Sequence, residues 1–294
     1  MSNAELISDG KHSTGESPVW VPEEQALYWV DIPAGQIWRW DSASQTTRFW
    51  TLPEKVGCIA HAGGGQWVAG METGVFRVTL TNDGSANTAL LAKANHASPT
   101  MRFNDGRCDR QGRFLAGTMF LNMAEAKAVG AVSSFNAAGD QRVLLEHLIV
   151  PNGMAFSPDG KTMYLSDSHP TVQTIWALDY DTDSGTPSNR RVFVDMTPLP
   201  GRPDGAAVDA DGCYWICGND AGLVHRFTPE GKLDQSFAVP VKKPAMCAFG
   251  GEKLDTLFVT SIRPAGADLE DQPLAGGVFA LRPGVRGIPE SKFR

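Results

Sequence analysis

Short segments in which apolar and polar residues alternate recur from one end of the chain to the other. Residues 26–31 and 36–40 form one such pair, and residues 213–216 and 222–227 form a later pair with the same arrangement. Both pairs are rich in aromatic and β-branched residues, and their two-residue period is that of a half-buried strand. The pattern therefore predicts antiparallel hairpins throughout. Further pairs occupy residues 66–70 and 74–78, 162–165 and 174–178, and 256–260 and 277–281.

A short motif opens these groups of strands and returns six times. Each strong copy begins a run that ends fifteen residues later, and weaker copies lie near residues 56–58 and 245–247. The copies start roughly 40 to 52 residues apart, which is the length of one four-stranded blade of a β-propeller. We therefore expect an all-β fold, a six-bladed β-propeller with four-stranded antiparallel blades around a central channel. The strong copies begin at Glu16, Asn104, Asn152 and Asp204.

The repeat occupies the whole sequence, so residues 1–294 are expected to form a single propeller domain. A propeller has to close its ring, because an unpaired strand edge would otherwise remain. We expect residues 5–9 to supply the outermost strand of the last blade, after residues 277–281. The segment 119–130 breaks the pattern, since it is longer than a tight turn and rich in helix-forming residues. It indicates either a loop or short helical flap over one face, or a surface insertion without a role.

Composition narrows the class of protein. The chain of 294 residues is 42% hydrophobic and carries a net charge of −7, which disfavours nucleic acid and anionic membranes as partners. It has neither an apolar stretch near the ~20 residues of a membrane span nor the pattern of a signal peptide. The five cysteines include no Cys-x-x-Cys pair, which predicts reduced thiols in a cytoplasmic protein. A closed propeller can be a monomer, and we expect a monomer.

The first residues of the four strong copies carry the candidate chemistry. Equivalent positions in a propeller lie at one height around the axis, so Glu16, Asn104, Asn152 and Asp204 should converge at one mouth of the channel. Carboxylates confined together repel one another, and a divalent cation removes that cost. An all-oxygen set suits Ca²⁺, Mg²⁺ or Mn²⁺, and Zn²⁺ or Fe²⁺ can also bind such a set. Too few protein ligands fill the shell, so water or substrate must complete it.

A plainer interpretation is that these residues are turn formers at the entry to a strand. Asn152-Gly153 and Asp204-Gly205 are ordinary turn dipeptides. Four oxygen-bearing residues in register, one of them Glu, are harder to explain in this way. The six histidines show no ligand spacing and are interpreted as surface or packing residues, and the lack of a Gly-x-Ser-x-Gly elbow disfavours a serine hydrolase.

Several motifs in order resemble the senescence-marker-protein/gluconolactonase family, whose fold is a six-bladed propeller. They are Gly15-Glu16-Ser17-Pro18-Val19-Trp20, Leu27-Tyr28-Trp29-Val30-Asp31-Ile32, Arg102-Phe103-Asn104-Asp105-Gly106, Pro151-Asn152-Gly153, Ser157-Pro158-Asp159-Gly160-Lys161 and Pro203-Asp204-Gly205. The resemblance covers nearly the whole chain. It implies that Glu16, Asn152 and Asp204 bind one divalent metal, that Asn104 lies beside it as a ligand or substrate contact, and that Arg102 binds the substrate.

The activity implied by the resemblance is hydrolysis of a sugar-acid lactone, a small-molecule substrate. Under that hypothesis the metal polarises the lactone carbonyl and Asp204 accepts a proton from the attacking water. Asp31, Asp167 and Asn219 end the fifteen-residue runs and are not expected to be direct ligands of the metal. Some relatives carry an acidic residue facing the substrate where this chain has residues 120–123, so the substrate is open. The alternatives are a metal-dependent organophosphate or aryl esterase, and a calcium-binding propeller without activity.

Overall fold

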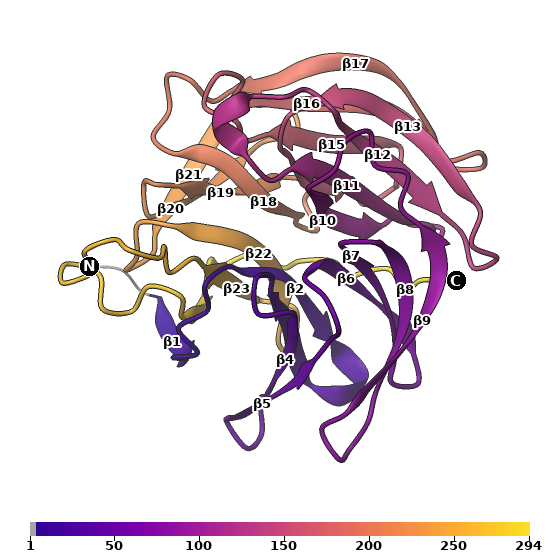
Figure 1. Ribbon diagram of the computed structural model, residues 1–294. Helices are drawn as coiled ribbons and strands as arrows, with labels where there is room; N and C mark the ends of the chain where they lie inside the picture. The colour runs from indigo at the N-terminus through magenta and orange to yellow at the C-terminus, as the bar shows by residue number, and fades with distance from the viewer. Residues whose placement is uncertain (1–3) are drawn as a thin grey trace.

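The structure, a computed structural model, describes residues 4–294. Six four-stranded antiparallel sheets stand around a common axis, which confirms the six-bladed β-propeller expected from the repeat (Figure 1). In five blades the strands follow one another in chain order from the axis outward. Two single turns of 3₁₀ helix, η1 (Pro22–Glu24) and η2 (Met123–Glu125), interrupt the strands. Within residues 4–294 no helix is both long and apolar enough to cross a membrane.

The first three blades use the following strands. Blade 1 contains β2 (Gly15–Val21), β3 (Ala26–Asp31), β4 (Gln36–Asp41) and β5 (Thr46–Thr51). Blade 2 contains β6 (Val56–Gly63), β7 (Gln66–Met71), β8 (Gly74–Leu80) and β9 (Ala86–Lys93). Blade 3 contains β10 (Met101–Cys108), β11 (Phe114–Phe120), β12 (Gly130–Phe135) and β13 (Gln141–Leu148).

The remaining blades continue around the ring. Blade 4 contains β14 (Pro151–Phe156), β15 (Thr162–Asp167), β16 (Thr174–Asp181) and β17 (Thr186–Asp195). Blade 5 contains β18 (Arg202–Val208), β19 (Tyr214–Asn219), β20 (Leu223–Phe227) and β21 (Leu233–Ala238). Blade 6 contains β22 (Pro244–Gly250), β23 (Thr256–Ser261), β24 (Val278–Leu281) and, from the N-terminus, β1 (Glu5–Ser8).

The last blade joins the two ends of the chain. Strand β1 pairs antiparallel with β24, with Glu5 opposite Ala280 and Leu6 opposite Phe279. This pairing covers an edge of β24 that would otherwise expose unpaired backbone groups. The N-terminal segment therefore completes the blade that the C-terminal part of the chain begins.

Aromatic pairs fill the space between neighbouring blades. Tyr28 of blade 1 lies 4.5 Å from Trp67 of blade 2, between ring centroids. Tyr164 of blade 4 lies 4.9 Å from Tyr214 of blade 5 in the same way. Such pairs add to the hydrophobic gain from burying large rings. Because each blade packs on two neighbours, the core is divided among the junctions of the ring.

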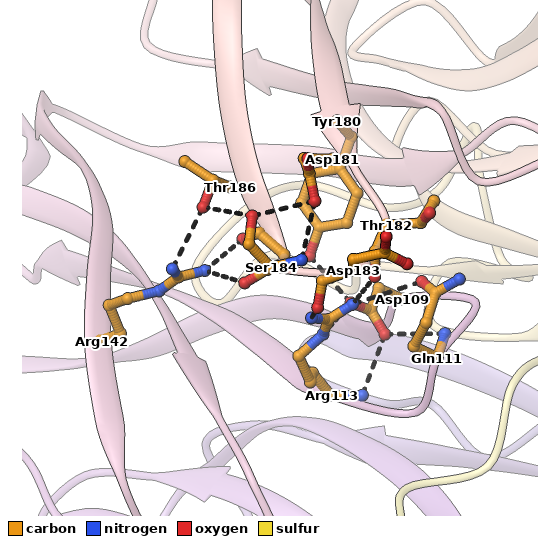
Figure 2. A network of polar contacts seen from close by, with 11 residues as sticks. Asp109, Gln111, Arg113, Arg142, Tyr180, Asp181, Thr182, Asp183, Ser184 and Thr186 are labelled. Carbon is orange, nitrogen blue, oxygen red and sulfur yellow. Dashed lines mark hydrogen bonds and ion pairs between the residues drawn. The ribbon is translucent and has the colours of Figure 1, made fainter.

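A buried carboxylate joins blades 3 and 4 (Figure 2). Asp109, in the turn after β10, is fully buried and accepts hydrogen bonds from the Arg113 Nε (2.6 Å) and the Tyr180 hydroxyl (2.8 Å). The Arg113 guanidinium then donates to the backbone oxygens of Thr182 and Asp183 in the β16–β17 turn. Burial of a charge is tolerated only when it is paired and hydrogen-bonded in this way. The network therefore fixes the turn of one blade against the turn of the next.

The C-terminal segment closes one end of the axial channel. It crosses the ring beyond blade 6 (Figure 1). Its Gly287 forms an isolated β-bridge with Asp209, and its Phe293 N donates a hydrogen bond to His61 O at 2.8 Å. Within the channel, the Arg107 Nη1 donates to the Glu290 Oε1 at 2.7 Å. The cavity at this place measures only about 10 Å³. Access to the channel is therefore from the opposite end, where the inner strands begin.

Candidate functional site

A cavity of about 290 Å³ lies at the end of the channel where the inner strands begin. It is lined by all five residues singled out in the sequence, namely Glu16, Arg102, Asn104, Asn152 and Asp204. They come from β2, β10, β14 and β18, so four blades contribute. A larger hollow of about 720 Å³ between blades 1 and 6 contains none of these side chains. The convergence expected from the repeat is therefore present at one mouth of the channel.

A register shift in the inner strand positions each of these site residues. The inner strand of every contributing blade shifts register beside the site residue, as between Glu16 and Val19 and between Asn152 and Ala155. Such a bulge re-aims a side chain that would otherwise follow the pleat. In β14 the bulge places Gly153 at φ +62°, a conformation that suits glycine. A Cβ on that residue would come within 2.5 Å of the Tyr214 hydroxyl. Packing at the site therefore requires glycine after Asn152, beyond the preference of a turn.

A chain of hydrogen bonds orients the two amides. The Arg102 Nη1 donates to the Asn104 Oδ1 at 2.8 Å, and the Asn104 Nδ2 donates to the Asn152 Oδ1 at 2.8 Å. The Asn152 Nδ2 then donates to the Ser168 Oγ at 2.6 Å. Arg102 can only donate, so its bond fixes which end of Asn104 is oxygen, and each later bond follows. The Asn152 oxygen is thereby fixed on the side that faces Asn104, and its amide nitrogen on the side that faces Ser168.

Two carboxylates face each other at the floor of the cavity. Glu16 and Asp204 are each 7% exposed, and the Glu16 Oε2 accepts a hydrogen bond from Ser17 N at 2.9 Å. Burial raises the pKa of Glu16 well above its usual range, and the Asp204 charge raises it further. Burial likewise raises the pKa of Asp204, while a bond from Asn219 opposes the shift. Two buried carboxylates carry like charges that repel each other, and a bound cation would stabilise the pair.

Asn219, which the sequence did not place among the metal ligands, also belongs to this group of side chains. Its Nδ2 donates to the Asp204 Oδ2 at 2.6 Å, and the residue lines the cavity. It lies there because β19 returns antiparallel to β18, so the end of the run lies beside its beginning. Asp31 and Asp167, at the matching places, bind backbone instead, with Asp31 accepting from Thr14 N and Asp167 from Val150 N. The fifteen-residue spacing between Asp204 and Asn219 was the signal in the sequence that these two residues lie side by side.

The donor set is compatible with a divalent cation. Glu16, Asp204 and Asn152 offer two carboxylates and an amide oxygen, which hard cations prefer. Within residues 4–294 no group of three or more His, Cys, Asp or Glu side chains is placed to hold a metal, and this set contains only two. The Asn219 Oδ1 is buried beside Asp204 without a hydrogen-bond partner among the described residues. An oxygen without a donor next to two buried acids fits a site for a cation better than a site for an anion.

The segment 119–130 contributes to the wall. Strand β11 continues to Phe120, and the segment then forms the single turn η2 and extended chain before β12. Met119 and Met123 line the cavity, and the His169 Nε2 contacts the backbone oxygen of Met123 at 3.1 Å. Of the two interpretations of this segment, the short flap at the mouth agrees with the structure. Its contribution to the cavity is apolar.

Comparison with known proteins identifies the family. Residues 14–263 match the family model described as the SMP-30/gluconolactonase/LRE-like region. The chain belongs to this family. It is 38% identical over 281 residues to a 6-deoxy-6-sulfogluconolactonase from Pseudomonas putida, covering 95% of this chain and 94% of the relative. It is 34% identical to an L-arabinolactonase from Azospirillum brasilense, covering 99% and 95%.

The fold of the family agrees with the fold described above. A solved structure of a calcium-binding protein, regucalcin from Agrobacterium tumefaciens, superposes with a TM-score of 0.92 at 26% identity. The match covers 100% of this chain and 98% of that one. The family assignment supports a sugar lactone hydrolase as the class of protein.

Proposed function

We propose that this protein hydrolyses a sugar-acid lactone to the aldonic acid and depends on one divalent metal ion. The observation that carries the proposal is the convergence of Glu16, Asn104, Asn152 and Asp204 from four blades in one cavity with Arg102. The relatives named as lactonases for two different sugar lactones support the reaction class. The calcium-binding relative supports a divalent ion, whose identity is left to experiment.

Glu16, Asn152 and Asp204 would hold the ion. When bound, it would act as a Lewis acid that polarises the lactone carbonyl and offsets the negative charge developing on its oxygen. Asn104 would bind the substrate beside it. Asn104 also fixes the orientation of the Asn152 amide, through the hydrogen bond that it donates to the Asn152 oxygen.

Asp204 would accept a proton from the water that attacks the carbonyl and return it to the ring oxygen as the acyl C–O bond of the lactone breaks. Asn219 holds its Oδ2, so the Oδ1 is the oxygen that receives the proton. Arg102 presents a rigid set of N–H donors to the substrate hydroxyls, and its bond to Asn104 ties its position to the amide relay. Met119 and Met123 exclude water from one side of the substrate.

A pH-indicator assay of aldonolactone hydrolysis tests the proposal. The panel contains gluconolactone, galactonolactone, xylonolactone and arabinonolactone, with protein before EDTA treatment, after it, and after return of Ca²⁺, Mg²⁺, Mn²⁺ or Zn²⁺. We expect hydrolysis that is lost with EDTA and restored by a divalent ion. Hydrolysis unaffected by EDTA would contradict the metal, and hydrolysis of paraoxon or aryl esters alone would favour the esterase alternative.

A further inference from the structure

Three basic side chains occupy the same position in three different blades. Arg102, Arg202 and Lys243 each stand one residue before the register shift of the inner strand, at Phe103, Pro203 and Pro244. Equivalent positions of a propeller lie at one level around the axis. All three side chains line the cavity described above. Their backbone positions therefore form a basic level, defined as Arg102, Arg202 and Lys243, although the Arg102 guanidinium turns to Asn104 and only Arg202 and Lys243 remain above the oxygen-bearing side chains.

The two levels are separated along the strand. Arg202 precedes Asp204 by two residues on β18, and Arg102 precedes Asn104 by two residues on β10. Two residues of a strand span roughly 6–7 Å. This separation is comparable with the length of a six-carbon sugar lactone. A substrate with its carbonyl at the oxygen level therefore places its far end at the basic level.

The charges at the basic level are only partly compensated. The Arg202 Nε donates to the Asp220 Oδ2 at 2.7 Å, and the Lys243 ammonium pairs with the other oxygen of the same carboxylate. One carboxylate thus holds two cations side by side, so the group of Arg202, Lys243 and Asp220 carries one net positive charge. Arg202 is 23% exposed and Lys243 is 28% exposed at the side chain, so both reach the open mouth. A neutral sugar would gain little from such an excess charge.

We propose that the substrate carries an oxyanion group at the end remote from its lactone carbonyl, bound by Arg202 and Lys243. This inference rests on the proposed lactonase function and adds the class of substrate. A sulfonate, phosphate or carboxylate accepts charge-assisted hydrogen bonds from guanidinium and ammonium groups. Val150 and Thr14 line the cavity at the matching places of blades 4 and 1, and Arg102 of blade 3 is bonded to Asn104, so the basic side chains at the open mouth are those of blades 5 and 6. The anionic end is therefore oriented toward blades 5 and 6.

Matched substrates test the inference. Gluconolactone is compared with its counterparts that bear a phosphate, sulfonate or carboxylate at carbon 6, and the expected kcat/KM for at least one anionic member is about tenfold higher or more. Comparing the three anionic lactones shows which oxyanion group the site prefers. The preference should decline as salt is raised, because the pair at the mouth is partly exposed to solvent. Equal or better hydrolysis of the neutral lactone would overturn the inference and leave the lactonase standing.

Variants assign the effect to the basic level. Arg202→Gln and Lys243→Gln should each lower the anionic-to-neutral ratio of kcat/KM by about tenfold. Arg202→Lys keeps the charge and should retain part of the preference, which separates recognition from a merely structural role. Lys242→Gln is the control, because the neighbouring Lys242 pairs with Asp271 and does not line the cavity. An equal loss in Lys242→Gln, or an unchanged ratio in both Arg202→Gln and Lys243→Gln, would overturn the inference.

A binding measurement separates this inference from the reaction. Calorimetric titration compares gluconate with 6-phosphogluconate, which differ only in the remote group. If no lactone is hydrolysed, the proposed function fails. Tighter binding of the phosphorylated acid that depends on Lys243 would then still support the anion subsite, and equal binding of both acids would overturn it.

Discussion

Asn219 donates a hydrogen bond of 2.6 Å to the Asp204 Oδ2, across the antiparallel pair β18 and β19. Asn219 does not occupy the first position of a repeat, yet it fixes one oxygen of the proposed proton acceptor. The bond favours the ionised form of Asp204 and so lowers its pKa, against the effect of burial. Asn219 is therefore a positioning residue whose removal has a predictable direction.

Asn219→Ala should raise the pKa of Asp204, because a hydrogen bond to its carboxylate is lost. The acidic limb of the pH–rate profile should move to higher pH, and kcat should fall by roughly 10- to 100-fold with a smaller change in KM. The measurement is the pH dependence of lactone hydrolysis, together with far-UV circular dichroism to confirm the fold. A uniform loss of rate at every pH would assign Asn219 a structural role instead.

Asp204→Asn should separate activity from stability. Loss of a proposed ligand and proton acceptor should lower turnover by at least about 10²- to 10³-fold and weaken metal binding. The same change removes one of two like charges buried together, so the metal-free protein should be more stable by about 1–2 kcal/mol. Thermal melts with EDTA and with Ca²⁺ check both parts, and a metal-free variant less stable than the parent would contradict the electrostatic argument.

We expect the protein to lose stability in mild acid because of the buried His12. It accepts a hydrogen bond from the Trp29 Nε1 at 2.9 Å, and burial lowers its pKa to about 4. The unfolded chain, with an ordinary histidine pKa near 6.5, binds more protons than the folded one between about pH 6.5 and 4. The contribution of His12 is therefore fully present above pH 6.5 and is lost as the pH falls toward 4, by up to about 3 kcal/mol.

The variant His12→Gln checks this contribution, because the amide can still accept from Trp29 and does not titrate. Urea unfolding at several pH values should show a flatter decline for His12→Gln than for the parent between pH 6.5 and 4. The exposed His147, changed to Gln, is the matched control. Parallel pH profiles for the parent and His12→Gln would show that another group causes the decline.

Asp109→Ala should weaken the junction between blades 3 and 4 (Figure 2). It leaves Arg113 and the Tyr180 hydroxyl without their buried acceptor, and breaking a buried pair in this way costs about 3–5 kcal/mol. Arg142→Ala in the same region is the control, because Arg142 is exposed and should cost less than about 1 kcal/mol. Urea unfolding of both variants gives the comparison, and similar costs for the two would show that Asp109 does not hold the blades together.

The convergence of the four oxygen-bearing side chains was predictable from the sequence because a repeat fixes position. Glu16, Asn104, Asn152 and Asp204 share one place in four copies, and a closed ring turns a shared place in the chain into a shared height in space. The bulge beside each residue, and the amide relay from Arg102 to Ser168, could not be predicted in the same way. They depend on side-chain directions that alternate with each residue and change at every register shift.

By itself the sequence determined the blade count, the fold class and four of the residues in the cavity, since these follow from period, alternation and register along the chain. Only the tertiary structure showed the hydrogen bond from Asn219 to Asp204 and placed Arg202 and Lys243 on one carboxylate at the mouth. It also sealed the far end of the channel with Glu290 on Arg107, residues 183 positions apart. These contacts depend on side-chain directions and on how the ring closes and packs, which the repeat along the chain does not fix.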